Sequence, residues 1–240
     1  MNTRKALVSI LMFLSVSLSA CAPVATSMPT AMPSIPTTIS LTPTGVPTPA
    51  QTTVSSKIFK IPMSVTFGPD WYYVNVYSPQ AFTLQYRPAN LLIDFLIVDN
   101  VTVTLFASGD PPAHFPFPDD FAGYLKSSDY FSDITPKIPI SLGGAEGYQV
   151  DAVGSHSAPI KTPFFSFNDN NFKEFVNSTP QKFRFFYLDG ISGKRLLIVI
   201  GSNNGQSDNG RLVNPLPIDQ FDALMPKVHD VLDTVVFSKP

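Results

Sequence analysis

The chain contains one cysteine, Cys21, and its thiol is the side chain whose position most clearly indicates a chemical role. A single cysteine excludes an intrachain disulfide, so the thiol needs another explanation. It follows Leu18-Ser19-Ala20, at the end of an apolar stretch that begins after Arg4 and Lys5. A charged start, an apolar segment and a small residue before the cleavage point are the parts of a secretory signal. The pattern predicts that residues 1–20 are removed and that Cys21 becomes the new N-terminus.

Other residues with catalytic or metal-binding chemistry are sparse. The histidines are His114, His156 and His229, and their spacing is not typical of a shared metal site. Ser155 and Ser157 flank His156, but a nucleophile and its base are brought together by the fold rather than by adjacency. The sequence also lacks the G-x-S-x-G motif of a nucleophile elbow. We therefore expect no metal, no cofactor and no catalytic activity.

Two aspartates lie in asparagine-rich segments, Asp169 within 168–171 and Asp208 within 207–210. Carboxylate oxygens can bind calcium, but an EF-hand loop needs more acidic ligands and a closing glutamate. Polar turn chemistry is the better interpretation of both segments.

Residues 1–22 resemble the signal of a bacterial lipoprotein, with Leu18-Ser19-Ala20-Cys21 as the lipobox. The resemblance implies a diacylglyceryl thioether on Cys21 and leaves open an acyl group, such as palmitate, on its amine. Two or three lipid chains make a stable membrane anchor. An ordinary secreted protein is the alternative. A permanent membrane helix is disfavoured, because residues 6–20 would span about 22 Å of a bilayer core that is roughly 30 Å thick.

The resemblance places the mature chain on the extracytoplasmic side of a membrane. Residue 22 is alanine rather than the aspartate that resembles an inner-membrane retention signal, so the cell membrane and the outer membrane both stay open. Residues 21–56 would then connect the lipid to the domain. Proline, threonine and serine make up 21 of residues 22–56, and this stretch carries no charge. Such a composition predicts a disordered, extended tether.

Residues 57–240 are expected to form a single domain. Removal of residues 1–20 leaves 14 basic and 18 acidic residues, a net charge of −4. Nucleic-acid binding is therefore not expected, because it requires a basic surplus. The domain contains all eight tyrosines, the one tryptophan and 19 of the 20 phenylalanines, which predicts a strongly aromatic core.

Apolar alternation and β-branched or aromatic residues predict a mainly antiparallel sheet with two helices, an α+β fold. One helix is expected to open at Pro118-Asp119-Asp120, with the proline at its first position, and to end by about Tyr130. A second helix is expected over 221–232. Pro226 conflicts with a straight path there, so this helix either kinks at Pro226 or has its regular part start near it. The glycines of 143–147 are expected to form a hairpin turn rather than a phosphate loop. The predicted strands are 58–65, 71–77, 81–86, 91–98, 101–107, 138–142, 148–153, 182–187, 195–200 and 234–237, the first of them an edge strand broken at Pro62.

A turn leading into Trp71, a long antiparallel run, a late strand pair and a helix ending in Leu-Asp-Thr-Val-Val-Phe at 232–237 resemble the PsbP-like (Mog/PsbP) group. Similar domains in bacterial lipoproteins have a proline-containing turn before a tryptophan and a terminal Leu-x-Ser/Thr-x-x-Phe. The resemblance covers 57–240 and implies an antiparallel sheet between helices, an α/β/α sandwich. Members include photosystem accessory proteins and a small-GTPase-binding protein. They share no catalytic residues, so no function is transferred.

One aromatic stretch is a candidate binding surface. If exposed, these side chains would form an apolar patch large enough to mark a partner, a ligand or a membrane. The alternative is that they cover the core. The residues are Phe164, Phe165, Phe167, Phe172 and Phe175.

Three hypotheses for the function follow. The first is a non-catalytic accessory or binding domain that has an unidentified protein partner and is attached to the membrane through Cys21. The lack of a catalytic constellation, the tether and the aromatic excess favour it. The second is a carrier of a small apolar ligand, which needs a cavity of roughly a few hundred Å³ between sheet and helix. The third is an enzyme whose acids and bases converge in a cleft that the sequence does not reveal.

Overall fold

The computed structural model does not describe every part of the chain. Cys21, the signal and the tether up to residue 49 lie outside the described residues, so the predictions made for them remain predictions. For 102–106, 113–114, 162–167 and 171–174 the backbone alone is described. The described residues are 50–55, 57–74, 78–99, 102–106, 113–128, 130–154, 162–167, 171–174, 180–202 and 216–238.

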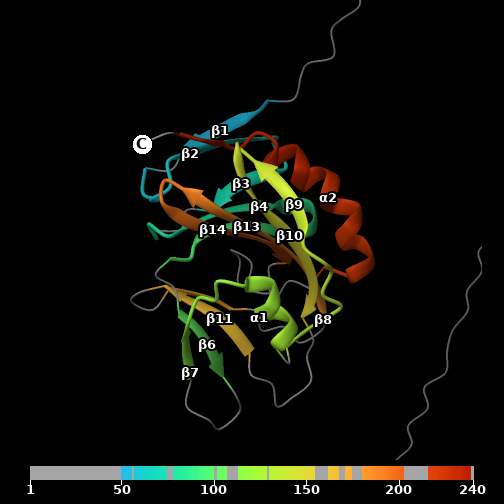
Figure 1. The fold of residues 1–240 in the computed structure, drawn as a ribbon. Coiled ribbons are helices and arrows are strands. Elements are labelled where there is room, and N and C mark those ends of the chain that lie inside the picture. The colour runs from blue at the N-terminus through green and yellow to red at the C-terminus, as the bar shows by residue number, and fades with distance from the viewer. Residues whose placement is uncertain are drawn as a thin grey trace, which may run out of the picture. The chain divides into compact units, whose positions relative to one another are not determined.

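The largest sheet has eight strands, and its neighbouring strands are antiparallel (Figure 1). Strand β9 pairs with β10 beside the main path of the sheet. In spatial order the strands are β3 (Trp71–Val74), β4 (Ala81–Tyr86), β5 (Leu91–Ile97), β14 (Lys194–Ser202), β13 (Gln181–Ile191), β10 (Ala145–Gly154) and β8 (Phe131–Ser132), with β9 (Ile138–Leu142) on β10.

Two smaller antiparallel sheets and two helices complete the described fold. The α+β architecture expected from the sequence is confirmed, but with three sheets instead of one. One small sheet contains β1 (Thr52–Ser55), β2 (Met63–Phe67) and β15 (Val236–Phe237), and the other contains β12 (Asn171–Glu174), β11 (Thr162–Phe167), β6 (Thr102–Phe106) and β7 (Ala113–Pro116). The helices are α1 (Phe121–Ser127) and α2 (Ile218–Leu232), and Arg87–Ala89 forms a short 3₁₀ turn.

The large sheet is buried on both faces. Successive side chains of a strand point to opposite faces, so neighbouring residues of β13 and β5 enter different clusters. Phe185 and Leu96 belong to the cluster beneath α1, whereas Phe186 and Phe95 belong to the cluster beneath α2 and the β1-β2-β15 sheet. This double burial explains why the residues of β5 form an almost unbroken apolar run. The expected arrangement of a sheet between helices is therefore present.

Helix α1 begins one turn later than the proline signal indicates. Phe121, rather than Pro118, is the first helical residue. Asp120 precedes it, and its carboxylate accepts a 3.1 Å hydrogen bond from the backbone N–H of Gly123. Aspartate is a favoured residue at this capping position. Phe121 and Leu125 then lie on the buried face, so the four-residue spacing of the apolar side chains decides how the helix packs.

Helix α2 runs without interruption through Pro226, which resolves the conflict noted in the sequence. Pro226 is exposed, and Phe221, Met225, Val228 and Val231 are buried on the other side of the helix. Proline removes one helical hydrogen bond. On the solvent side, water can bond the carbonyl that this leaves, while the buried stripe holds the helix on the sheet.

The glycine-rich segment after β9 is a hairpin turn, as predicted. Gly143 and Gly144 have φ values of +55° and +81°, which glycine adopts without steric penalty. A Cβ atom at Gly143 would also lie 2.8 Å from the ring of Phe237. The turn thus lets the C-terminal strand approach the hairpin closely.

The start of the domain differs from the prediction in two respects. Strand β1 lies inside the segment expected to be tether, so the folded part begins before Lys57. This strand has no apolar alternation and forms because β2 pairs with it, Val54 opposite Val65. Strand β2 starts at Met63, after Pro62, and lies between β1 and β15 rather than at an edge. Proline cannot donate to a strand ladder, so it precedes the strand instead of interrupting it.

Candidate functional site

A groove of about 470 Å³ lies between the β2–β3 turn and the C-terminal half of α2. This volume is within the range of ligand pockets. Segments from three distant parts of the sequence line it. The lining residues are Gln51, Thr66, Phe67, Gly68, Pro69, Asp70, Trp71, Tyr86, Lys227, Asp230, Val231 and Thr234.

Two aromatic side chains that face each other belong to the apolar part of the groove, Trp71 and Tyr86. Trp71 and Tyr86 lie directly opposite each other on β3 and β4, and their ring centroids are 5.1 Å apart at an interplanar angle of 47°. They are 6% and 8% exposed. Tilted ring pairs at this distance are favourable and hold both rings in place. The groove therefore has a rigid aromatic surface before any ligand arrives.

The turn before Trp71 closes the sheet side of the groove. The backbone N–H of Trp71 donates to the carbonyl of Gly68 at 3.1 Å, and the N–H of Arg87 donates to the carbonyl of Asp70 at 3.0 Å. Pro69 restricts the backbone within this turn. These bonds fix the Gly-Pro-Asp-Trp segment against the end of β4.

The other wall is the end of α2. The hydroxyl group of Thr234 accepts from the N–H of Thr66 at 2.8 Å and lies 2.8 Å from the carbonyl oxygen of Thr66 and 2.7 Å from that of Val231. The two motifs that carry the family resemblance, the turn before Trp71 and the terminal 232–237 segment, thus meet at this groove. Sequence reasoning treated them as separate structural signals and did not find the groove.

Charged groups stand at the rim. Nζ of Lys227 lies 3.9 Å from a carboxylate oxygen of Asp230, and these side chains are 57% and 71% exposed. A pair so exposed contributes little to stability, so both charges can interact with a ligand. Asp70 adds a second carboxylate to the lining. The groove combines an apolar floor with polar groups at its edge.

The predicted phenylalanine surface belongs in part to the four-stranded sheet. Phe164, Phe165 and Phe167 lie on β11 and Phe172 lies on β12, where the backbone alone is described; Phe175 is outside the described residues. Whether these side chains cover the core or face solvent therefore remains a prediction. Strands β11 and β12, which contain Phe164, Phe165, Phe167 and Phe172, pair in antiparallel fashion, although the sequence had indicated a loop-rich stretch.

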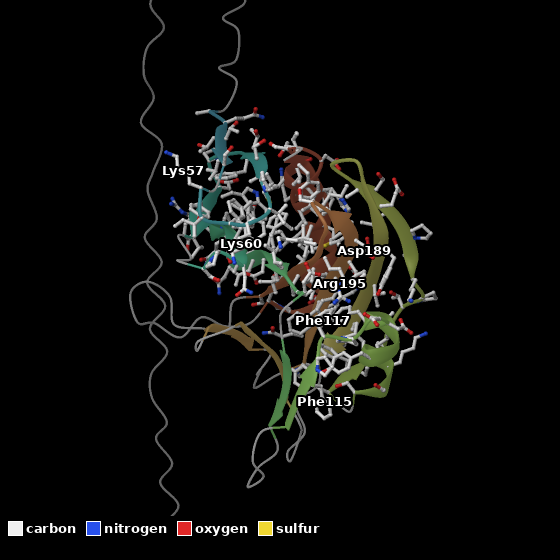
Figure 2. The ribbon with its side chains drawn as sticks, turned by 60° about the vertical axis from the view of Figure 1, so that its left-hand side comes forward. Lys57, Lys60, Phe115, Phe117, Asp189 and Arg195 are labelled. Carbon is white, nitrogen blue, oxygen red and sulfur yellow. The ribbon has the colours of Figure 1, made fainter. Side chains whose placement is uncertain are left out.

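Phe115, on β7 of the same sheet, was not predicted as a candidate and is 46% exposed. Phe117, two residues later, is buried and stacks on Phe121 with ring centroids 5.5 Å apart. Figure 2 shows Phe115 beyond Phe117 at the lower end of the domain. The chain therefore passes from an exposed aromatic residue directly into the core beneath α1.

The remaining candidates do not come together. His229 is exposed on α2, with its ring 6.4 Å from that of Phe186, and His114 lies on β7, where the backbone alone is described. His156, with the serines on either side of it, lies outside the described residues, as do Asp169 and Asp208. Among the described residues, no group of three or more histidine, cysteine, aspartate or glutamate side chains is placed to hold a metal ion.

Titratable groups on the α1 side of the large sheet form a structural cluster. Burial raises the pKa of Tyr148 to about 12 and also raises that of Tyr187. Burial disfavours the charge of Arg195, but hydrogen bonds to Asp99 and Tyr187 outweigh it and raise the pKa of the guanidinium. Arg195 also forms an ion pair with Asp119 at 2.8 Å, which connects the segment just before α1 to β14. None of these shifts brings a group toward neutral pH, where acid–base catalysis operates.

A second ion pair that sequence reasoning missed lies between β10 and β13. Arg184 donates two hydrogen bonds to Asp151, at 2.8 and 2.7 Å, and both side chains are largely buried. The two residues are directly opposite in the strand register, 33 positions apart in sequence. No local pattern could have revealed this pairing.

Comparison of the chain with protein-family models, with curated proteins and with solved structures finds no match. Within the part of the chain that the structure describes, neither helix has the length and apolar character that a membrane span requires.

Proposed function

We propose that this protein is a lipid-anchored extracytoplasmic protein whose domain binds a partner without catalysing a reaction, and that the groove beside Trp71 is its binding site. The observation that carries the proposal is the groove itself. A fixed pair of aromatic rings, Trp71 and Tyr86, lies beneath a rim with charges of both signs. This combination is typical of sites that bind through apolar contact and orient the ligand through a few polar groups.

The groove supports binding of a partner better than transport of an apolar molecule. A carrier needs a site that encloses its ligand in apolar surroundings. Asp70, Lys227 and Asp230 all line this groove, and the last two are more than half exposed. Such charges would have to lose water to cover an apolar ligand, which is unfavourable. A partner that supplies its own polar groups avoids this loss.

The membrane anchor is a separate part of the proposal, supported by the lipobox sequence at Cys21. The Cys21→Ala variant, expressed in the native host, is expected to leave the membrane fraction, because removal of the thiol removes the site of lipid attachment. Fractionation followed by immunoblotting measures this. If the variant remains in the membrane fraction as fully as the wild type, the anchor is not at this cysteine.

Capture of a partner tests the role of the groove. The full-length protein, immobilised, is exposed to its native envelope extract, and the bound protein and lipid are identified by mass spectrometry. A Lys227→Ala/Asp230→Ala double variant removes both rim charges without changing the net charge. A partner retained by the wild type is expected to be lost or reduced several-fold with this variant.

A charge-matched variant controls for nonspecific effects. Lys126→Ala/Asp219→Ala removes one exposed charge of each sign from other parts of the two helices, outside the groove lining. It is expected to capture the partner as the wild type does. Equal capture by all three proteins would exclude the groove as the binding site. Co-purification of a small lipid with no protein partner would favour the carrier hypothesis instead.

A further inference from the structure

The charged side chains that line the groove beside Trp71 indicate the charge of its ligand. They belong to Asp70, Lys227 and Asp230, so the lining carries one more negative charge than positive charge. Complementary charge steers a partner to a site, and like charge excludes the wrong partner. The lining therefore favours a positively charged group over a negatively charged one.

Asp70 has the carboxylate that is most available to a ligand. The residue is exposed, and within the part of the chain that the structure describes its carboxylate forms no ion pair. Arg87 is held beside it through the backbone, because the N–H of Arg87 donates to the carbonyl of Asp70 at 3.0 Å. The guanidinium of Arg87, however, lies over the ring of Tyr72, 4.7 Å from the ring centroid. Arg87 therefore leaves the charge of Asp70 to a ligand.

The alternation of strand β3 explains why Arg87 does not neutralise the groove. Trp71 and Tyr72 are successive residues of β3, so their side chains point to opposite faces of the sheet. Trp71 lines the groove, and the guanidinium that lies over Tyr72 is on the other face. The sheet thus separates this positive charge from the groove.

The second carboxylate of the lining, on α2, is only loosely paired. Nζ of Lys227 lies 3.9 Å from a carboxylate oxygen of Asp230, which is longer than a hydrogen bond, and both side chains are more than half exposed. An exposed pair of this kind contributes little to stability, so the lysine can turn away at small cost. Asp230 can therefore also interact with a positive group in the groove.

The apolar part of the groove indicates which kind of cation fits. Lysine and arginine side chains have an apolar stem and a charged end. The stem can pack against Trp71 and Tyr86 while the charged end reaches the carboxylate of Asp70. A groove of about 470 Å³ has room for such a side chain and for the residues next to it. A metal ion would use the carboxylates but leave the aromatic surface without a contact.

We propose that the groove binds a lysine or arginine side chain of the protein partner, with the stem against Trp71 and Tyr86 and the charged end at Asp70 and Asp230. The inference rests on the proposed function for the identity of the site, and it adds the chemical class of the ligand. Because the carboxylates are exposed, added salt is expected to weaken this binding.

Equilibrium dialysis of the purified full-length protein against isotope-labelled tripeptides tests the charge preference. Each peptide has arginine, lysine, glutamine or glutamate between two glycines, and its ends are acetylated and amidated so that only the central side chain differs. At low salt we expect the arginine and lysine peptides to bind at least about fivefold more tightly than the glutamate peptide, with the glutamine peptide between them. The tighter of the two basic peptides identifies the preferred group, guanidinium or ammonium.

An isosteric variant tests the role of Asp70. Asp70→Asn keeps the shape of the side chain and the backbone carbonyl that bonds Arg87. It is expected to weaken binding of the basic peptides by about two- to fivefold, as for loss of an exposed ion pair, and to leave binding of the glutamine peptide unchanged. Asp219→Asn is the matched control, because it removes an exposed carboxylate in the first turn of α2, outside the groove lining. It is expected to bind all four peptides as the wild type does.

Three results would overturn the proposal. They are binding of the glutamine or glutamate peptide as tight as that of the basic peptides, equal losses in the Asp70→Asn and Asp219→Asn variants, and no binding of any peptide at millimolar concentration.

The two proposals fail in different experiments, because dialysis against peptides needs no envelope partner. Partner capture that depends on Lys227 and Asp230, together with peptides that show no preference for positive charge, would reject the ligand class and keep the binding site. Peptide binding that depends on Asp70, without any captured partner, would keep the ligand class and reject the envelope partner.

Discussion

The backbone N–H of Thr66 donates a 2.8 Å hydrogen bond to Oγ1 of Thr234, a residue 168 positions later in the chain. The same hydroxyl group lies 2.8 Å from the carbonyl oxygen of Thr66. One side chain thereby joins the end of α2 to β2 and sets the distance between the two walls of the groove. Because Val231, three residues before Thr234, and Val235, the residue after it, are both buried, the helix end cannot shift without disturbing the core.

Replacement of Thr234 by valine, which has nearly the same shape, is expected to lower the free energy of unfolding by about 1–3 kcal/mol. The N–H of Thr66 would lose its acceptor in a partly buried position. Urea denaturation followed by circular dichroism measures the change. Thr53→Val is the matched control, because the hydroxyl of Thr53 bonds the side chain of Thr66 at an exposed position. If Thr53→Val lowers the free energy of unfolding as much as Thr234→Val does, the hydrogen bond between Thr66 and Thr234 does not contribute more to stability than an exposed one.

Removal of one partner of the buried ion pair between β10 and β13 is expected to lower the free energy of unfolding more than the Thr234 replacement does. Arg184→Met is expected to reduce the free energy of unfolding by about 3–5 kcal/mol, because it leaves the carboxylate of Asp151 buried without its guanidinium. Lys227→Met removes one partner of an exposed pair and is expected to change stability by less than about 1 kcal/mol. Chemical denaturation of both variants tests the difference, and similar losses would contradict the assignment of a buried pair.

Stability at alkaline pH should depend on Tyr148. Burial raises its pKa from 10.0 to about 12 in the folded protein. Below pH 10 the phenol is protonated in both states and its full contribution to stability is present. Between pH 10 and 12 the unfolded chain loses the proton first, so the free energy of unfolding falls as pH rises.

The Tyr148→Phe variant is expected to make this alkaline decline shallower while leaving stability at neutral pH nearly unchanged. Some decline should remain, because burial also raises the pKa of Tyr124. Denaturation curves at intervals from pH 8 to 12 provide the comparison. A decline as steep as that of the wild type would show that Tyr148 ionises with equal ease in the folded and unfolded chains.

Gly147 is required for close approach of two strands. A Cβ atom there would lie 2.0 Å from the carbonyl oxygen of Tyr187 on the neighbouring strand, so the Gly147→Ala variant must displace backbone. We expect a loss of at least about 1–3 kcal/mol, the usual range for overpacking. Gly68→Ala has open space around the added atom and should change stability by less than about 0.5 kcal/mol. Thermal denaturation followed by circular dichroism compares the two variants. Equal melting temperatures would contradict the close approach of the two strands at Gly147.

Several elements were predictable because their signals are local. The double burial of β5, the turn at Gly143 and Gly144, and the buried stripe of α2 all follow from the spacing of neighbouring residue types. Backbone conformation and the direction of side chains depend on a few adjacent residues, so the sequence alone determined these elements and the α+β class. The lipobox that we propose at Cys21 rests on a linear pattern alone, as does the tether that the composition of residues 22–56 predicts.

Other features required the tertiary structure. Strand β1 has little intrinsic strand signal and exists because β2 pairs with it. The contacts of Thr66 with Thr234 and of Asp151 with Arg184 join residues whose separation in sequence carries no information about their proximity. The groove is formed where three such segments meet, so no single segment predicts it. Sequence patterns determined most of the elements that form, whereas long-range pairing and packing decided which side chains share a surface. The reason is that burial of apolar surface is favourable irrespective of how far apart the contacting residues lie along the chain.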